Sequence, residues 1–462
     1  MFTHDTGYNL LAHYSNYLWG GPILILLFGV GLYQTWKLNG LQLRYLARAL
    51  TLSFSTTERE KSQDKQTKQN DGDLSAFQAL MTALAGSIGT GNITGIATAV
   101  TTGGLGALFW MWVMAFLGMA TAYSEAILAL KYRQLNKHGR MAGGPMYTLY
   151  HGLKAHKLAY LYAAIAGVAT ICIGCLAQCH SMVDAITGVY PLERLSVGIC
   201  LAVLTGAVII GGVRFIGKVA GVLVPFMTVG YLTVAIGIVL WNYQQLLPAV
   251  QLILHSAFNG QAALGGFLGA TVAAAMQNGA QYGIFANEAG MGSLAIAASS
   301  ARAEPVEQGL RAVGGVFLST IMVCTLTGLV LAVTQVIGSV DSQGALLTGT
   351  PLAMAAFKSV HPSLEYVVVG SILLFAFSTM LAWAYYGEKC VEFLLGIRVV
   401  YVYRWIFTLV IVLGSVMHLK IVWVIASLAT AMMAFPNLIS VIGLSKEVVA
   451  ETKTYFSRVT TN

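Results

Sequence analysis

The sequence of 462 residues contains little charge. Only 10% of its residues are Asp, Glu, Lys or Arg, whereas a soluble domain has roughly 25%. It also lacks the HExxH and GxSxG motifs of common hydrolases, and it has no carboxylate pair with metal-ligand partners. Hydrophobic residues make up 57% of the chain. These features argue against the familiar enzyme classes and predict an integral membrane protein.

The apolar residues form long runs. A spanning helix needs about 20 residues, and runs this long exclude the alternating strands of a porin-type barrel. The N-terminus lacks the basic start of a cleaved signal peptide, so we expect the first run to be retained. We predict an all-α polytopic membrane protein with about 11 transmembrane helices. The predicted spans are 17–36, 75–102, 106–131, 158–183, 195–213, 219–241, 265–298, 309–338, 364–387, 402–419 and 421–443.

The basic residues are distributed unequally between the two sides of this arrangement. Of the 26 Lys and Arg residues, only Arg194, Lys358 and Lys420 fall in loops on one side. Because short cytoplasmic loops are rich in Lys and Arg, we predict an external N-terminus and a cytoplasmic C-terminus in a bacterial inner membrane. The net charge of +8 is spread over many loops, which does not indicate nucleic acid binding. The lipid bilayer is the expected environment, and nothing indicates an obligate protein partner.

One stretch weakens its own helix. Residues 86–95 read GSIGTGNITG and lie within the charge-free segment from Leu74 to Ser124. Each glycine costs about 1 kcal/mol relative to alanine in a helix interior. Backbone groups freed in lipid cost several kcal/mol more unless something binds them. We therefore predict that the helix is broken in this stretch and that the break has a function.

Two interpretations of this stretch compete. Gly91 and Gly95 have the spacing of a helix-packing motif, which lets two membrane helices approach closely. Packing alone does not require the polar side chains of Ser87, Thr90 and Asn92. Secondary transporters unwind a helix near the bilayer midplane, so that backbone groups bind substrate and ion. The polar side chains favour this second interpretation.

A matching interruption is expected five helices later. The run 265–298 carries many polar and glycine residues between Gln277 and Gly292. The ten helices after the first divide into two sets of five, and an odd number per repeat inverts the second set. We predict an N-terminal helix and polar linker (1–73), a first repeat (74–262), a second repeat (263–445) and a cytoplasmic tail (446–462). The candidate substrate ligands are Ser87, Thr90, Gly91, Asn92, Gln277, Gln281 and Gly283.

Two glutamates lie within predicted spans, where ionisable residues are functional candidates. Glu125 is close to Lys131 and Arg133 in the sequence, so a structural or gating ion pair and a substrate role are both open. Glu288 follows the second interruption, where it could bind a coupling cation, receive a proton or cap loosened backbone. We favour capping or gating, because a fixed carboxylate near the site would repel an amino acid carboxylate.

Several separated blocks resemble the sodium:alanine (amino acid:cation) symporters, a family of alanine and glycine carriers with the inverted-repeat fold of the leucine transporter. The blocks are FQALMTALAGSIGTGNITGIATAV, GALFWMWVMAFLGMA, GGPMY, NEAGMGS and YYGEKC, in that order along the chain. The resemblance implies a core of five plus five helices with two broken helices and one additional N-terminal helix. It also implies that backbone N–H groups at Thr90 and Gly91 bind the substrate carboxylate, with Asn92 beside the substrate.

The same resemblance implies a sodium site. Its ligands would be the carbonyls of Ala85 and Ile88 and the hydroxyls of Ser378 and Thr379. The alternative for the two hydroxyls is a hydrogen bond to the preceding turn of their own helix, which is common for Ser and Thr. Ser319 stands where the family usually has an aspartate, which keeps a proton-coupled alternative open.

These observations predict a secondary active transporter. We expect sodium-coupled symport of a small neutral amino acid, alanine or glycine, by alternating access, with sodium as coupling ion and no organic cofactor. The alternatives are a proton-coupled symporter and a sensor that keeps the carrier fold but binds its amino acid without uptake. A channel is disfavoured, because channel filters are built from rings of like residues, whereas this chain has two different breaks.

Overall fold

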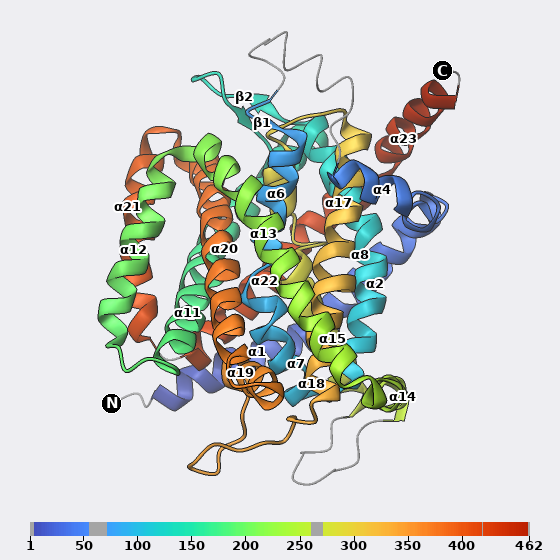
Figure 1. Ribbon diagram of the computed structural model, residues 1–462. Helices are drawn as coiled ribbons and strands as arrows, with labels where there is room; N and C mark the ends of the chain where they lie inside the picture. The colour runs from blue at the N-terminus through green and yellow to red at the C-terminus, as the bar shows by residue number, and fades with distance from the viewer. Residues whose placement is uncertain (1–3, 55–71, 260–270, 418, 461–462) are drawn as a thin grey trace.

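The computed structural model describes residues 4–54, 72–259, 271–417 and 419–460. Most of the predicted polar linker and the first residues of the predicted run 265–298 lie outside the described residues. Figure 1 shows a bundle of helices in which α1 begins at the lower end and α23 lies at the upper end.

The N-terminal part consists of helices only. A long helical segment is divided at Gly20 and Gly21 into α1 and α2, and two short helices follow. Their bounds are α1 (His4–Gly20), α2 (Pro22–Lys37), α3 (Leu41–Arg44) and α4 (Leu46–Phe54).

The next part contains the first broken helix, and it begins with a well-formed cap. Gln78 N donates to Ser75 Oγ at 3.1 Å and Ser75 N donates to Gln78 Oε1 at 3.2 Å, which is the reciprocal capping box that favours a helix start. The elements are β1 (Leu74–Ser75), α6 (Ala76–Ser87), η1 (Thr90–Asn92), α7 (Thr94–Gly103), α8 (Gly106–Lys131), β2 (Gln134–Leu135), β3 (Met141–Ala142), α9 (Pro145–Tyr147), η2 (Thr148–Gly152), α10 (His156–Ile171), η3 (Cys172–Leu176), α11 (Ala177–Thr187), α12 (Arg194–Ile210), α13 (Gly212–Trp241) and α14 (Tyr243–Asn259).

The last part contains the second broken helix. Its N-terminus is capped by Thr271, whose hydroxyl accepts from Ala274 N at 3.1 Å. The elements are α15 (Val272–Asn287), α16 (Ser293–Ala298), β4 (Ala301–Arg302), α17 (Pro305–Val316), η4 (Phe317–Cys324), α18 (Thr325–Val333), α19 (Gly349–Val360), α20 (Leu364–Leu395), α21 (Arg398–Val416), α22 (Leu419–Gly443) and α23 (Ser445–Thr460).

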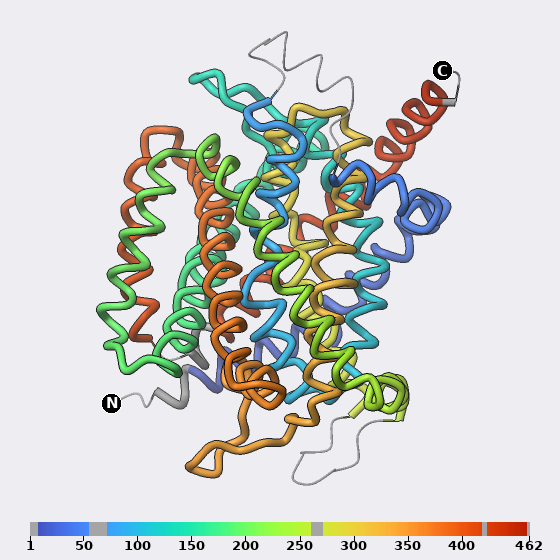
Figure 2. Tube along the Cα trace, viewed as in Figure 1, coloured from blue at the N-terminus to red at the C-terminus, as the bar shows by residue number. Residues whose placement is uncertain are grey.

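The two broken helices lie side by side and run antiparallel. α7 packs against α15, and α6 packs against α16. The Cα trace in Figure 2 shows α6 and α7 in the interior of the bundle. The parallel strands β1 and β4 join their ends, with Leu74 opposite Ala301 and Ser75 opposite Arg302. This antiparallel arrangement agrees with the inverted orientation expected of the two repeats.

The described residues contain eight helical segments that are long and apolar enough to cross a membrane. The broken helices are not among them because each is divided, and α12 is shorter. The total of eleven spans remains a prediction. The sequence did not predict the short helices α14 and α19.

The prediction of a loosened stretch from Gln277 onward is wrong in its extent. α15 is continuous to Asn287, and the interruption covers only residues 288–292. Gln277, Gln281 and Gly283 therefore lie in a regular helix. A side-chain β-carbon at Gly283 would lie 3.1 Å from Met111 Cγ of α8, so this glycine serves the close packing of α15 on α8.

Candidate functional site

The first break is held open by its own asparagine. Asn92 Oδ1 accepts from Gly89 N at 2.9 Å, and Asn92 Nδ2 donates to the carbonyl of Ser319 at 3.0 Å. Asn92 Nδ2 also lies 3.4 Å from the carbonyl of Ala286 on α15. Asn92 is completely buried, so its amide connects the first break to the helices that surround it.

The carbonyls freed by this break meet a hydroxyl of α20. Thr379 Oγ1 donates to Ala85 O at 2.8 Å and lies 3.4 Å from Ile88 O. Ser378 Oγ instead donates to Phe375 O of its own helix at 2.9 Å, which is the alternative considered for this pair. The structure thus brings together Ala85, Ile88 and Thr379. Carbonyl and hydroxyl oxygens are suitable ligands for a hard cation such as sodium.

Gln178 of α11 reaches the backbone of the first break, and sequence reasoning missed it. Its Oε1 atom accepts from Thr90 N at 3.1 Å and from Thr90 Oγ1 at 3.0 Å. Its Nε2 atom donates to Ile173 O at 3.2 Å. A polar amide inside the predicted span 158–183 was the available signal, because polar residues within spans are functional candidates.

An aromatic ring limits the space beside Gly91. A β-carbon at Gly91 would lie 2.7 Å from Phe285 Cδ1, so the ring touches the backbone there. The Phe285 ring centroid is 5.1 Å from that of Trp423. Both rings line a small cavity that includes Gln281, whose Nε2 donates to Ser427 Oγ at 2.8 Å. The space beside the first break is therefore narrow.

The second break is held by side chains from other helices. Glu125 Oε1 of α8 accepts from Gly290 N at 2.9 Å, and Asn437 Nδ2 of α22 donates both to the same carboxylate oxygen and to Gly290 O. Tyr162 OH of α10 donates to Met291 O at 3.0 Å. These contacts satisfy backbone groups that the interruption frees, as buried polar groups require.

The ion pair considered for Glu125 and Lys131 does not form. Lys131 Nζ lies 2.9 Å from Glu447 Oε2 and 3.1 Å from Glu451 Oε1, both on α23. Glu125 is buried within α8 and binds backbone instead. The lysine connects α8 to the C-terminal helix, and the glutamate connects α8 to the second break.

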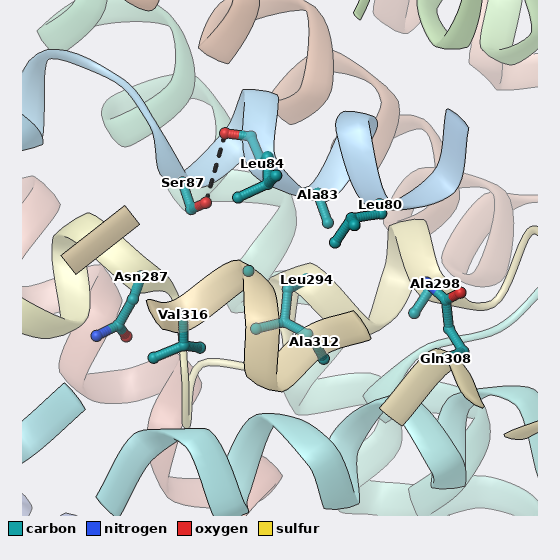
Figure 3. Close-up of a pocket in the computed structure, with 11 residues that line it drawn as sticks. Leu80, Ala83, Leu84, Ser87, Asn287, Leu294, Ala298, Gln308, Ala312 and Val316 are labelled. Atoms are coloured by element: carbon teal, nitrogen blue, oxygen red, sulfur yellow. Dashed lines mark hydrogen bonds between the residues drawn. The ribbon is translucent and has the colours of Figure 1, made fainter. Parts of the chain in front are cut away.

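A small cavity lies between α6, α16 and α17, where α6 otherwise packs against α16 and α17. Figure 3 shows Leu80, Leu84 and Ser87 facing Leu294 and Val316 across it, together with other residues of the lining. Its volume is about 20 Å³, which is room for roughly one water molecule. The lining is mostly apolar, with Ser87 at the end near the breaks.

The sequence profile of the sodium:alanine symporter family matches residues 4–462, which is almost the whole chain. The chain belongs to the sodium:alanine symporter family. As a member of that family it is a multi-pass membrane transporter and not an enzyme.

Two curated relatives are similar to this chain over nearly their whole length. An uncharacterized transporter of Haemophilus influenzae is 45% identical over 98% of this chain and 97% of its own. The sodium/alanine symporter AgcS of Methanococcus maripaludis is 43% identical over 97% of each chain. A crystal structure of MhsT in complex with L-phenylalanine superposes with a TM-score of 0.59, at 12% identity, over 83% of this chain and 92% of that one. The MhsT comparison establishes the leucine-transporter type of fold for this symporter family member.

Proposed function

We propose that this protein couples the inward movement of a small neutral amino acid, alanine or glycine, to the entry of sodium. The observation that carries this proposal is the contact of Thr379 Oγ1 with the carbonyls of Ala85 and Ile88, which the break frees. Thr90, whose N–H group is bound by Gln178, follows two residues after Ile88. One broken helix thereby offers oxygen ligands for a cation and N–H donors for an anion.

The substrate carboxylate is proposed to bind at Thr90. The acceptor at Thr90 N is now the neutral amide oxygen of Gln178, and a carboxylate oxygen is a stronger acceptor for the same N–H group. Binding then exchanges one acceptor for another, so no buried N–H is left without a partner. Among the described residues, the side chains that accept from the N–H groups of Gly89 and Thr90 are the neutral amides of Asn92 and Gln178.

The proposed preference for alanine or glycine rests on space. Phe285 already touches Gly91, and the neighbouring cavity lined by Phe285 and Trp423 has a volume of only about 10 Å³. A methyl side chain needs little rearrangement of these rings, whereas a branched or aromatic side chain needs much more. Close packing makes such rearrangement costly.

Coupling is proposed to arise because the sodium ligands come from two different elements. Ala85 and Ile88 belong to the first broken helix and Thr379 to α20, so a bound ion stabilises the arrangement in which these elements meet. A ligand shifts a conformational equilibrium only by its differential affinity for the two states. Sodium therefore favours the state in which Thr90 is positioned for substrate.

Alternating access also requires an exit, which we place between α6, α16 and α17. The cavity of about 20 Å³ between them is too narrow for an amino acid, so these helices must separate for release. The distribution of basic residues supports a cytoplasmic location for this end of the bundle. The same argument gives an external N-terminus and a cytoplasmic C-terminus.

Reconstitution into liposomes tests the proposal. Purified protein is supplied with labelled alanine or glycine under an inward sodium gradient, an inward proton gradient or neither. Uptake driven by the sodium gradient is expected. Uptake driven only by the proton gradient would establish the proton-coupled alternative, and sodium-independent binding without uptake would establish the sensor.

Single cysteines test the proposed orientation. Lys137 is exposed in the loop between β2 and β3, and Ser342 is exposed in the loop between α18 and α19. The two loops lie at opposite ends of the bundle (Figure 1). A cysteine at Ser342 should react with an impermeant reagent added to intact cells, and a cysteine at Lys137 only in inverted vesicles. Reaction of both from one side would overturn the orientation.

A further inference from the structure

Glu288 carries a carboxylate that the second break does not fully use. The residue ends α15 in a left-handed conformation with φ 59° and is completely buried. Its Oε2 atom accepts from Ser293 Oγ at 2.7 Å. Among the described residues, its Oε1 atom has no partner in hydrogen-bond geometry, although the Trp383 indole lies near the carboxylate. The N–H of Gly290 is bound by Glu125 instead. Capping of the backbone therefore does not account for Glu288 Oε1.

A second unpartnered oxygen faces the same place. Tyr386 of α20 is buried, and its hydroxyl has no hydrogen-bond partner within the described ranges of the chain. A β-carbon at Gly86 would lie 2.6 Å from Tyr386 OH and 2.9 Å from Glu288 Oε1. The absence of a side chain at Gly86 leaves both oxygens directed at one point. Trp383 closes one side of it, donating its indole N–H to Gly86 O at 3.3 Å.

The carboxylate has no positive partner in the part of the chain that the structure describes. The ion pairs found there join other acidic residues to Lys, Arg or His. The titratable groups around Glu288 are Glu125 of α8, Tyr162 of α10 and Tyr386 of α20, and none of them carries a positive charge. An ionised carboxylate buried without a countercharge is costly.

We propose that Glu288 and Tyr386 form a second site for a monovalent cation, between α6, α16 and α20. A sodium ion would take the Glu288 carboxylate and the Tyr386 hydroxyl as oxygen ligands. A proton would bind the carboxylate and bridge it to the hydroxyl. Either cation removes the uncompensated charge and gives both unpartnered oxygens a partner.

The second site adjoins the proposed first one. Gly86 follows Ala85, whose carbonyl binds Thr379, and both sites are closed by α6 and α20. The consequence for coupling, which rests on the proposed symport, is that two cations accompany each amino acid. Cation binding itself does not depend on the identity of the substrate.

Coupling stoichiometry provides the first test. In proteoliposomes, the membrane potential that just prevents net alanine flux against a fixed alanine gradient gives the number of cations per substrate. The parent protein should give two and Glu288→Gln one. Repeating the measurement with the sodium gradient or the pH gradient set to zero identifies the cation. A parent value of one, or an unchanged value in Glu288→Gln, overturns the proposal.

Two neighbouring tyrosines give a matched control. Tyr386→Phe removes the proposed ligand, whereas Tyr385→Phe removes a hydroxyl that is bonded to Ser300 Oγ at 2.9 Å. Tyr386→Phe should raise the cation concentration for half-maximal uptake at least severalfold. Tyr385→Phe should leave that concentration at the parent value. Equal behaviour of the two variants contradicts a site at Tyr386.

A measurement without amino acid separates this proposal from the symport proposal. The melting temperature of the purified protein is recorded with sodium or choline at fixed pH, and over a pH series at fixed sodium. Glu288→Gln should flatten the dependence on one of these two variables even if alanine is not the substrate. If the folded variant keeps the dependence of the parent on both sodium and pH, the site does not exist.

Discussion

Both helix breaks free backbone groups that need hydrogen-bond partners, but the side chains around the two breaks differ in chemistry. The first break, around residues 88–93, has neutral partners, namely the amides of Asn92 and Gln178 and the hydroxyl of Thr379. The second break, at residues 288–292, lies beside two buried carboxylates, those of Glu125 and Glu288.

From this difference in partners we propose a different role for each break. The neutral amide oxygen of Gln178, which accepts from Thr90 N and Thr90 Oγ1, can be exchanged for a substrate group. The first break therefore suits transient binding. The Glu125 carboxyl group is harder to displace, because the same oxygen accepts from Gly290 N and from Asn437 Nδ2. We therefore propose that the second break is the fixed element and that the Glu288 carboxylate is available to a cation.

The largest expected effect is at the first break. Gly91→Ala places a methyl group 2.7 Å from Phe285 Cδ1, so binding and uptake of alanine should fall by at least about tenfold, equal to about 1.4 kcal/mol. Isothermal titration of the purified variant measures this. Gly95→Ala, with its nearest contact at 3.3 Å to Tyr282 Cδ1, is the control and should bind normally. Parental affinity in a folded Gly91→Ala protein would remove the binding role of the first break.

Substitution of Glu125 at the second break should mainly lower the thermal stability of the protein. Glu125→Ala leaves Gly290 N without its acceptor, and an unsatisfied buried donor costs about 1–3 kcal/mol. Glu125→Gln keeps an acceptor oxygen and should lose less. Thermal unfolding in detergent measures both variants. If Glu125→Ala melts at the parental temperature, the carboxylate does not anchor this break.

Two adjacent hydroxyls sharpen the assignment of sodium to the first break. Thr379→Ala removes the hydroxyl that binds Ala85 O and should raise the sodium concentration for half-maximal uptake by roughly tenfold, about 1.4 kcal/mol. Ser378→Ala should change it less, because that hydroxyl is bonded to Phe375 O. The double variant should resemble Thr379→Ala. Identical sodium dependence in the parent and the double variant removes both hydroxyls from the site.

The smallest effect concerns the support of α8, which carries Glu125. Lys131→Ala breaks partly exposed ion pairs to Glu447 and Glu451, worth about 0–1 kcal/mol. Burial raises the pKa of Glu447, but hydrogen bonds from Tyr132 and Lys131 outweigh it, so the pKa is lowered. The stabilisation is therefore present at neutral pH and is lost as the pH falls through that lowered value. Unfolding of Lys131→Ala and parent should converge in acid and differ at neutral pH.

Much of the architecture could be predicted from residue order alone. The break at 86–95 and a second one five helices later were expected from glycine and polar residues in apolar runs, and both are present. The extent of the second break could not be predicted, because polar and glycine residues such as Gln277, Gln281 and Gly283 occur in continuous membrane helices as well as in interrupted ones. In the structure this part of α15 is a continuous helix that packs closely on α8.

The sequence by itself determined that this chain spans a membrane and where its helices weaken. Lipid offers no hydrogen bonds, so apolar length and intramembrane polarity can be read directly. Only the tertiary structure decided which group binds each freed backbone atom. Gln178 reaches Thr90, and Glu125 reaches Gly290, from positions 88 and 165 residues away in the chain. Such partners are set by how the helices pack in three dimensions, which local composition does not specify. The same packing placed the Tyr386 hydroxyl and Glu288 Oε1 beside Gly86.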